Sequence, residues 1–232
     1  MDNSTIIFDL DDTLTDYRTT NEYALQCVYE RLDMYMSEEE YNKFFEFESR
    51  YWKSFEKRQE IDTHGMNRID YVRSNIYREY FGDLVSLKLG YELMQIYINN
   101  LGVKNYIYNG VLETIQYLYK KYDMYIASNG PKEAQIRKLV NTNLYEYFKG
   151  ILSAEECGYA KPNQHFYDYL FDRYNIIPEE SVSIGDNLTT DILGGINNNM
   201  ATIWFNRRGI ENTTDIKPDV EIQNIKELKK IL

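Results

Sequence analysis

The stretch STIIFDLDDTLTD, residues 4–16, runs an apolar segment directly into a cluster of acids. Ile6, Ile7 and Phe8 are the kind of residues that fill a buried strand. The carboxylates that follow, at positions 9, 11, 12 and 16, lie close enough in the chain to repel one another and raise each other's pKa. A divalent cation would offset that cost, and Mg²⁺ and Ca²⁺ prefer oxygen ligands. The stretch therefore predicts a metal site where a buried strand ends.

Short apolar segments alternate with helical patterns along the rest of the chain. Together with the first, those rich in Ile, Val and Tyr predict buried strands at 6–10, 124–128, 150–153, 182–185, 201–205 and, more weakly, 220–222. Apolar residues at helical spacing lie between them, at 112, 115, 118 and 119, at 136, 139 and 140, and at 166, 169 and 170. This alternation predicts an α/β fold with a Rossmann-like, doubly wound parallel sheet, covered by helices on both faces.

Residues 17–104 interrupt the alternation, because they hold helical patterns and no convincing strand. Ser37 with Glu40 forms a capping-box pattern, which predicts that a helix begins there. We therefore expect a core domain made of 1–16 and 105–232, with 17–104 as a helical insert. Ligands bind at the carboxyl ends of strands in open α/β sheets, so an insert placed after the first strand would act as a cap over a site.

Polar residues follow three of the predicted strands, and a lysine lies in a turn between the last two of these groups. Because parallel strands bring their carboxyl ends to one edge of a sheet, these side chains should lie close together. The candidate site residues are Asp9, Asp11, Ser128, Asn129, Lys161, Asp186 and Asp191.

The acids of this set suit phosphoryl transfer. A metal held between Asp9, Asp186 and a phosphate would neutralise the repulsion between a carboxylate and a phosphate monoester. The Asp9 carboxylate could then attack phosphorus and form an aspartyl-phosphate. If residue 10 points into the core and the chain begins to coil there, Asp11 could protonate the leaving alcohol and later activate water.

The remaining polar residues suit phosphate binding and orientation. Ser128, together with the backbone N–H groups at and beside Asn129, could hold phosphate oxygens, and Lys161 could pair with the developing charge. Asp191 could orient Lys161 or the waters of the metal.

Each of these residues could also have an ordinary structural role. Asp9 or Asp12 could be a turn residue, and residues 128–131 (Ser-Asn-Gly-Pro) are typical of a turn. Lys161 could lie on the surface. Asp186 and Asp191 could cap the following helix. Four signals in order, three of them directly after strands, favour one shared site over four separate coincidences.

The motifs resemble those of the haloacid dehalogenase (HAD) superfamily. Asp9-x-Asp11-x-Thr13 resembles motif I, Ser128 motif II, Lys161 motif III, and Gly185-Asp186 with Asp191 motif IV. The resemblance implies that Asp9 is the nucleophile and Asp11 the acid/base. It also implies a Mg²⁺ ion bound by Asp9, the backbone carbonyl of Asp11 and Asp186, and a C1-type cap formed by the helical insert.

Two longer stretches resemble one branch of that superfamily. SAEECGYAKPNQHFYDYL (153–170) and IGDNLTTDILGGINNNMATIWFN (184–206) are similar to the bacterial HAD-type pyrimidine 5′-nucleotidases. The resemblance implies hydrolysis of nucleoside 5′-monophosphates. Ser128 stands where threonine is frequent in the superfamily, and either hydroxyl can donate to a phosphate.

Substrate choice is expected to lie in the insert, where 44–68 is rich in aromatic residues. One of these aromatic residues could stack on a base, with Trp52 as the first candidate and Tyr51 or Phe55 as the others. The same residues could instead form the helical core of the insert. His64 is interpreted as a loop residue that the mechanism does not need.

Composition limits the partners. With 37 acids against 26 bases, the net charge of −11 argues against binding of nucleic-acid polymers. No apolar run approaches the length of a membrane span, and Cys27 and Cys157, far apart in a chain without an export signal, predict a reduced, cytoplasmic protein. The expected partner is a small phosphorylated metabolite, and a monomer is compatible with the pattern.

Three rival functions stay open. A sugar-phosphate or other small-metabolite phosphatase would share every catalytic residue. A 2-haloacid dehalogenase uses an aspartate nucleophile but neither a metal nor a second aspartate such as Asp11. A non-enzymatic binding protein would be expected to have lost part of the set, whereas all the positions are filled.

Overall fold

The structure is a computed structural model that describes residues 4–56, 63, 65, 66 and 68–232; the side chains at 53, 55 and 56 lie outside the description. The chain divides into two compact units. Met1–Arg18 and Asn105–Leu232 form the first, called the core unit here, and Thr19–Lys104 form the second, called the helical unit. The sequence predicted this division at 1–16 with 105–232, and at 17–104.

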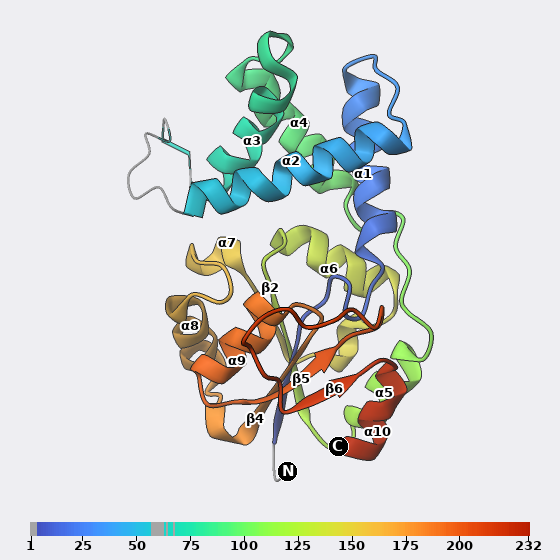
Figure 1. Ribbon diagram of the computed structural model, residues 1–232, viewed down its shortest axis with the longest axis vertical. Coiled ribbons are helices and arrows are strands. Elements are labelled where there is room, and N and C mark those ends of the chain that lie inside the picture. The colour runs from blue at the N-terminus through green and yellow to red at the C-terminus, as the bar shows by residue number, and fades with distance from the viewer. Residues whose placement is uncertain (1–3, 57–62, 64, 67) are drawn as a thin grey trace. The chain divides into compact units, whose positions relative to one another are not determined.

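The core unit is built on a six-stranded parallel sheet in the order β3-β2-β1-β4-β5-β6 (Figure 1). The chain winds from β1 toward one edge and then from β4 toward the other, which confirms the predicted doubly wound sheet. The strands are β1 (Thr5–Phe8), β2 (Asp123–Ser128), β3 (Gly150–Ser153), β4 (Ser181–Gly185), β5 (Ala201–Phe205) and β6 (Val220–Ile222).

The first strand ends at Phe8, so its predicted extension to Leu10 is wrong. The carbonyl of Leu10 accepts hydrogen bonds from the amides of Leu14 and Thr15, which coils the chain instead of continuing the ladder. Leu10 is nevertheless fully buried in the core. The apolar pattern alone could not show this, because Leu10 is equally apolar in a strand and in a coil.

Alternate residues of β1 point to two separate layers of core, as the two-residue period of a strand requires. Ile6 and Phe8 pack with residues of α5, α6 and α10, whereas Ile7 packs with residues of α8. Both faces of the sheet are therefore covered. The helices of the core unit are α5 (Val111–Leu118), α6 (Lys132–Asn141), α7 (Ala154–Cys157), α8 (Gln164–Tyr174), α9 (Leu193–Asn197) and α10 (Leu228–Ile231), with a π-helical turn at Leu188–Ile192 before α9.

Helix α6 forms where its apolar spacing predicts it, but its buried face differs from the apolar stripe. Leu139 is buried, whereas Val140 is 52% exposed. Gln135 and Lys138 are fully buried instead. Two polar side chains outside the predicted apolar stripe are therefore buried on this helix.

The helical unit contains no strand among its described residues, as predicted. The bounds of its helices are α1 (Tyr17–Arg31, which begins in the core unit), α2 (Glu38–Glu56), α3 (Arg68–Phe81) and α4 (Leu87–Asn100). The predicted start of α2 is confirmed, because the amide of Glu40 donates to Ser37 Oγ. Phe44 is buried and stacks on Tyr77, so part of the aromatic segment does form the unit's own core.

Over the described residues, no helix is both long enough and apolar enough to cross a membrane. Cys27 and Cys157 are both free thiols.

Candidate active site

The candidate site lies at the point where the winding of the sheet changes direction. β1 pairs with β4, so Asp9, directly after β1, and Asp186, directly after β4, come from neighbouring strands. Ser128 is the last residue of β2, which pairs with β1 on its other side. Such a switch point leaves a crevice at the carboxyl ends of the strands, where open α/β sheets bind ligands.

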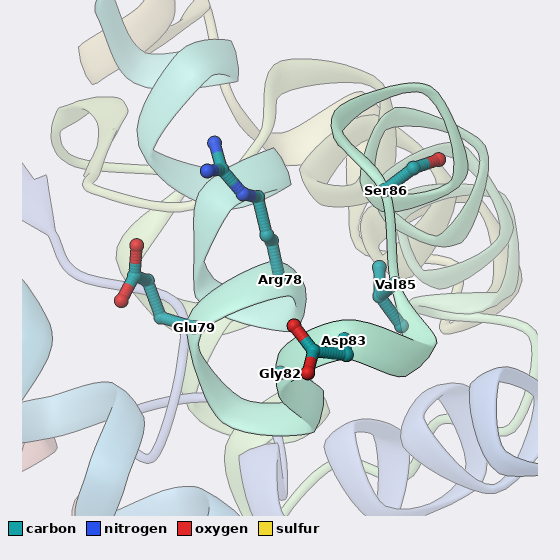
Figure 2. Close-up of a pocket in the computed structure, with 6 residues that line it drawn as sticks. All are labelled: Arg78, Glu79, Gly82, Asp83, Val85 and Ser86. Atoms are coloured by element: carbon teal, nitrogen blue, oxygen red, sulfur yellow. The ribbon is translucent and has the colours of Figure 1, made fainter.

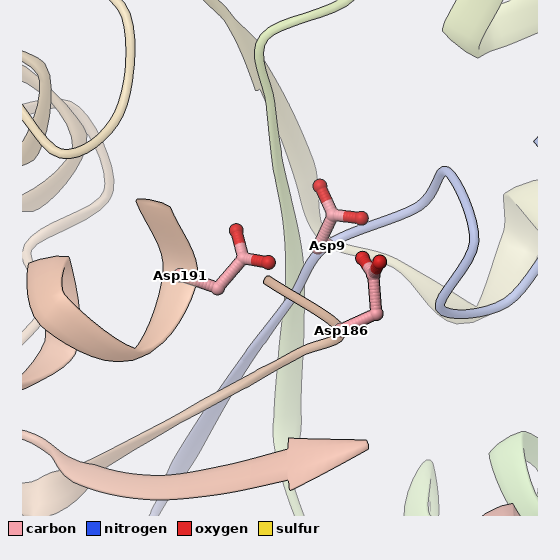
Figure 3. Close-up of side chains that lie close together, drawn as sticks. All are labelled: Asp9, Asp186 and Asp191. Atoms are coloured by element: carbon pink, nitrogen blue, oxygen red, sulfur yellow. The ribbon is translucent and has the colours of Figure 1, made fainter. Parts of the chain in front are cut away.

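Three carboxylates gather there (Figure 3). Asp9, Asp186 and Asp191 each offer an oxygen within 4.8 Å of the others. Burial raises the pKa of Asp9 and of Asp186 well above the usual range, and the carboxylate of Asp191 raises both further. Their negative charges are therefore unfavourable without a cation. A cluster of carboxylate oxygens of this spacing fits a hard divalent ion such as Mg²⁺.

Lys161 supplies one positive charge to this cluster. Its Nζ donates to Asp9 Oδ1 at 2.7 Å, to Asp191 Oδ1 at 2.7 Å and to the carbonyl of Ala127 at 2.6 Å. Burial lowers the pKa of Lys161, but the carboxylates of Asp191 and Asp9 outweigh burial and raise it above its ordinary value. All three ammonium hydrogens are engaged, so Lys161 orients Asp9 directly and would have to exchange a partner to contact a phosphate.

The polar residues after β2 are fixed by local hydrogen bonds. Ser128 is buried, and its Oγ accepts from the amide of Gly130 at 3.1 Å and from Gln135 Nε2 at 2.7 Å. Both lone pairs of the hydroxyl are thus used, which leaves its proton to donate elsewhere. Asn129 joins this loop to the backbone of Lys161, through Oδ1 at 2.7 Å and Nδ2 at 3.2 Å. Its side chain therefore aligns two loops of the site.

Asp191 has a partner on each oxygen. Oδ1 accepts from Lys161, and Oδ2 accepts from the amide of Asn187 at 3.1 Å. Gly185 makes room for it, because a Cβ at position 185 would lie 2.2 Å from Asp191 Oδ2. Asp191 is thus buried against the end of β4, in contact with Lys161.

Asp11 is held by α6, which the sequence reasoning missed. Lys138 Nζ lies 2.5 Å from Asp11 Oδ1, and Gln135 Nε2 lies 2.7 Å from Asp11 Oδ2. The signal that could have found them is the spacing of three, which places both side chains on one side of the helix that follows Ser128.

Asp12 is another residue to which the sequence reasoning gave no part in the site. Its backbone is left-handed, with φ of 62°, a conformation that aspartate tolerates better than most residues. Tyr108 donates to Asp12 Oδ1 at 2.7 Å, and Arg208 approaches Oδ2 at 3.7 Å. These partners fix the turn between Asp11 and Thr13, and the Asp12 carboxylate is still close enough to Asp186 for its charge to raise the pKa of Asp186.

The helical unit holds the residues predicted to read the substrate. Trp52 lies half-buried on α2, and its side chain donates a hydrogen bond to Glu48. Burial raises the pKa of Glu48, while Arg73 opposes that effect. His64 and the side chain of Phe55 lie outside the described residues. A separate hollow of about 390 Å³ on this unit is lined by Arg78, Glu79, Gly82, Asp83, Val85 and Ser86 (Figure 2).

A family comparison identifies the class of protein. Residues 6–205 match the model of the haloacid dehalogenase-like hydrolases. That match spans most of the chain, including the segments that carry Asp9, Asp11, Ser128, Lys161 and Asp186. The chain belongs to the haloacid dehalogenase-like hydrolase family.

Individual relatives refine that class. The HAD-hydrolase YfnB of Bacillus subtilis is 29% identical, over 98% of this chain and 94% of its own length. The pyrimidine 5′-nucleotidase PynA of Streptococcus pneumoniae is 27% identical, over 96% of this chain and 92% of its own length. A glyceraldehyde 3-phosphate phosphatase of Pyrococcus furiosus is 26% identical, over 86% of this chain and 79% of its own length. Family and relatives together support a phosphoric monoester hydrolase.

A solved structure of YfnB shares the fold. It superposes with a TM-score of 0.83 and covers 99% of this chain and 98% of its own. That crystal structure is described as bound to magnesium and as revealing interdomain movement.

Proposed function

We propose that this chain is a Mg²⁺-dependent phosphatase that hydrolyses pyrimidine nucleoside 5′-monophosphates through an aspartyl-phosphate. The observation that carries the catalytic part is the Asp9 carboxylate, which lies at the switch point of the sheet with Lys161 on one oxygen and Asp186 beside it. The substrate part rests on the resemblance to the nucleotidase branch and on the similarity to PynA.

The residues present fit a Mg²⁺ ion. Asp9 and Asp186, with the backbone carbonyl of Asp11, would hold it, and the crowded carboxylates supply the negative charge that a divalent cation balances. When bound, the ion neutralises the repulsion between the phosphate and these carboxylates. The crystal structure of YfnB is bound to magnesium, which supports magnesium as the ion.

Asp9 supplies the nucleophile. Lys161 fixes Oδ1, which leaves Oδ2 to attack phosphorus while the bond from phosphorus to the leaving oxygen breaks. Asp11 gives its proton to that leaving oxygen. In the second step Asp11 takes a proton from water, which attacks the aspartyl-phosphate and releases phosphate and free Asp9.

Ser128 would bind a phosphate oxygen with the hydroxyl proton that its two accepted hydrogen bonds leave available. The backbone N–H of Asn129 would add a further donor. These contacts recognise any phosphate monoester, so they cannot select a base.

Selection of the base is assigned to the helical unit, with Trp52 as the stacking residue. Stacking of a base on an aromatic ring contributes about 1–3 kcal/mol. Binding energy from a part of the substrate that does not react can be used for alignment and closure, which raises kcat/KM. The alternative is a sugar-phosphate phosphatase, which the similarity to the glyceraldehyde 3-phosphate phosphatase favours.

A substrate panel tests the proposal. Phosphate release is measured with UMP, dUMP, dTMP, ribose 5-phosphate and p-nitrophenyl phosphate, each with Mg²⁺ and with EDTA. We expect the best nucleotide to exceed ribose 5-phosphate in kcat/KM by about 10-fold or more, since about 1.4 kcal/mol from one stacked base gives that ratio. EDTA should abolish turnover of every substrate.

Variants of Trp52 locate the base. Trp52→Ala should shrink the ratio of nucleotide to ribose 5-phosphate while sparing p-nitrophenyl phosphate. Trp52→Phe is the matched control, because it keeps an aromatic face while it removes the hydrogen bond to Glu48. A panel in which sugar phosphates equal or exceed every nucleotide would replace the nucleotidase by the sugar-phosphate phosphatase.

A further inference from the structure

Two side chains of helix α6 bind the two oxygens of the Asp11 carboxylate. Lys138 Nζ lies 2.5 Å from Oδ1, and Gln135 Nε2 donates to Oδ2 at 2.7 Å. Both side chains are fully buried, whereas the Asp11 side chain keeps 20% of its surface exposed. The exposed part of the Asp11 carboxylate can therefore contact a substrate. Its buried part is held by Lys138 and Gln135, which solvent does not reach.

Gln135 also ties Asp11 to the phosphate-binding loop. The same Nε2 donates to Ser128 Oγ at 2.7 Å, so one amide group holds both residues. Gly130 opens the path for it, because a Cβ at position 130 would lie 2.0 Å from Gln135 Nε2 and 3.3 Å from Asp11 Oδ2. The Gln135 Oε1 atom has no hydrogen-bond partner within the described part of the chain. The contacts of this buried amide thus serve Asp11 and Ser128.

Lys138 is itself held from two further directions. The ring of Tyr17 lies 5.4 Å from its ammonium, and Asn105 Nδ2 donates to its backbone carbonyl at 3.1 Å. Tyr17 and Asn105 lie on the two segments by which the chain leaves and re-enters the core unit. Burying a charged side chain is unfavourable unless it is paired, and the partner that Lys138 receives is Asp11. An apolar residue would fill this helix position at lower cost.

We propose that Lys138 and Gln135 are positioning residues that hold the Asp11 carboxylate in the orientation needed for proton exchange with the leaving group and with water. Neither of them touches the substrate. Thr15 Oγ1 also donates to Oδ1 at 3.5 Å, so the proton that Asp11 exchanges is assigned to the second lone pair of Oδ2. The inference rests on the proposed function, in which Asp11 is the acid/base, and it adds the residues on which that role depends.

Leaving-group dependence tests the proposal, because a good leaving group departs without protonation and a poor one does not. Lys138→Met and Gln135→Leu are assayed under single-turnover conditions with p-nitrophenyl phosphate and with UMP. General acid–base catalysis contributes about 10²- to 10⁴-fold, so we expect each variant to lose about 10-fold or more with UMP and distinctly less with p-nitrophenyl phosphate. Lys138→Arg should recover part of the UMP activity.

Two controls separate positioning from folding. Lys132→Met removes a lysine from the same helix, whose ion pair at 2.6 Å is with Glu156 and not with Asp11, and should leave the ratio of the two substrates unchanged. In an Asp11→Asn background, Lys138→Met should cost about twofold or less, because residues that act as one unit are not additive.

The outcomes are distinct. An equal loss with both substrates in Lys138→Met and Gln135→Leu, or an undiminished effect of Lys138→Met in the Asp11→Asn background, would overturn the positioning role while the phosphatase stands. A wild-type protein that releases phosphate from none of the monoesters would overturn the proposed function, and the positioning role with it.

Discussion

The environment of Asp9 combines burial and neighbouring acids, which disfavour its negative charge, with one ammonium group, which favours it. Its carboxylate is nearly buried, adjoins two other acids and receives one ammonium at 2.7 Å. Asp9→Asn keeps the shape but removes the attacking charge and one metal ligand. We expect kcat to fall by at least about 10³-fold, comparable to removal of other covalent nucleophiles. Steady-state phosphate release with saturating Mg²⁺ measures the loss.

Asp12→Asn is the matched control, three residues further along the same loop. Asn is accepted in the left-handed backbone that position 12 adopts, and Tyr108 can donate to its amide oxygen as it does to the carboxylate. Less than about a tenfold loss is expected there. Near wild-type turnover in Asp9→Asn would remove the covalent mechanism altogether.

Single residues also mark the limit of prediction from the sequence. Asp9, Ser128, Lys161 and Asp186 were proposed because they lie at strand ends or in a turn in a recognisable order. Gln135 and Lys138 were not, because a polar residue within a helix is usually solvated and only tertiary contacts reveal its burial. The sequence therefore locates the groups proposed to react but not those that hold them.

At the scale of the element, the start of α2 depends on one hydroxyl. Ser37 Oγ accepts from the amide of Glu40 at 3.1 Å, which satisfies one of the unpaired donors of the first turn. Ser37→Ala should lower the free energy of unfolding by about 1 kcal/mol. Thermal or denaturant unfolding followed by circular dichroism measures the change.

Ser54→Ala is the matched control on the same helix. Ser54 is exposed and its Oγ bonds back to the carbonyl of Tyr51, a contact that contributes little to a helix. We expect a change within about 0.5 kcal/mol. Similar losses in both variants would show that the capping bond does not stabilise this helix.

Elements were predicted better than their ends and faces. All six strands were located, since a short apolar segment between two helical patterns is typical of a buried strand in an α/β chain. The end of β1 was missed by two residues, because hydrogen bonds to Leu10 decide it. The exposure of Val140 was missed for the same kind of reason: the apolar period identifies α6, while its rotation depends on contacts with Asp11 and Ser128.

For the whole molecule, the buried acids link stability to pH and to metal. Burial, followed by the charges of Asp9, Asp191 and Asp12, raises the pKa of Asp186 from 3.8 to about 8. Between these two values the folded chain binds more protons than the unfolded chain, so stability falls as pH rises through the window. In EDTA, the melting temperature of Asp186→Asn should therefore depend less on pH between 5 and 8 than that of the wild type.

Magnesium should act in the opposite sense. The ion competes with protons for the same carboxylates, so it should raise the melting temperature of the wild type more at pH 8 than at pH 6. Asp186→Asn should respond weakly at both values. A magnesium effect that is independent of pH and unchanged in the variant would place the ion elsewhere.

The order of strands in the sheet also has a consequence during synthesis. β1 lies between β2 and β4, yet its partners are made only when the ribosome has reached residues 123–128 and 181–185. At about 5–20 residues per second, the central strand waits on the order of 10 to 35 seconds before both of its edges can pair. Throughout that interval Ile6, Ile7 and Phe8 belong to a nascent chain that lacks at least one of the two neighbouring strands, whereas Thr19–Lys104 can emerge and collapse as a separate body.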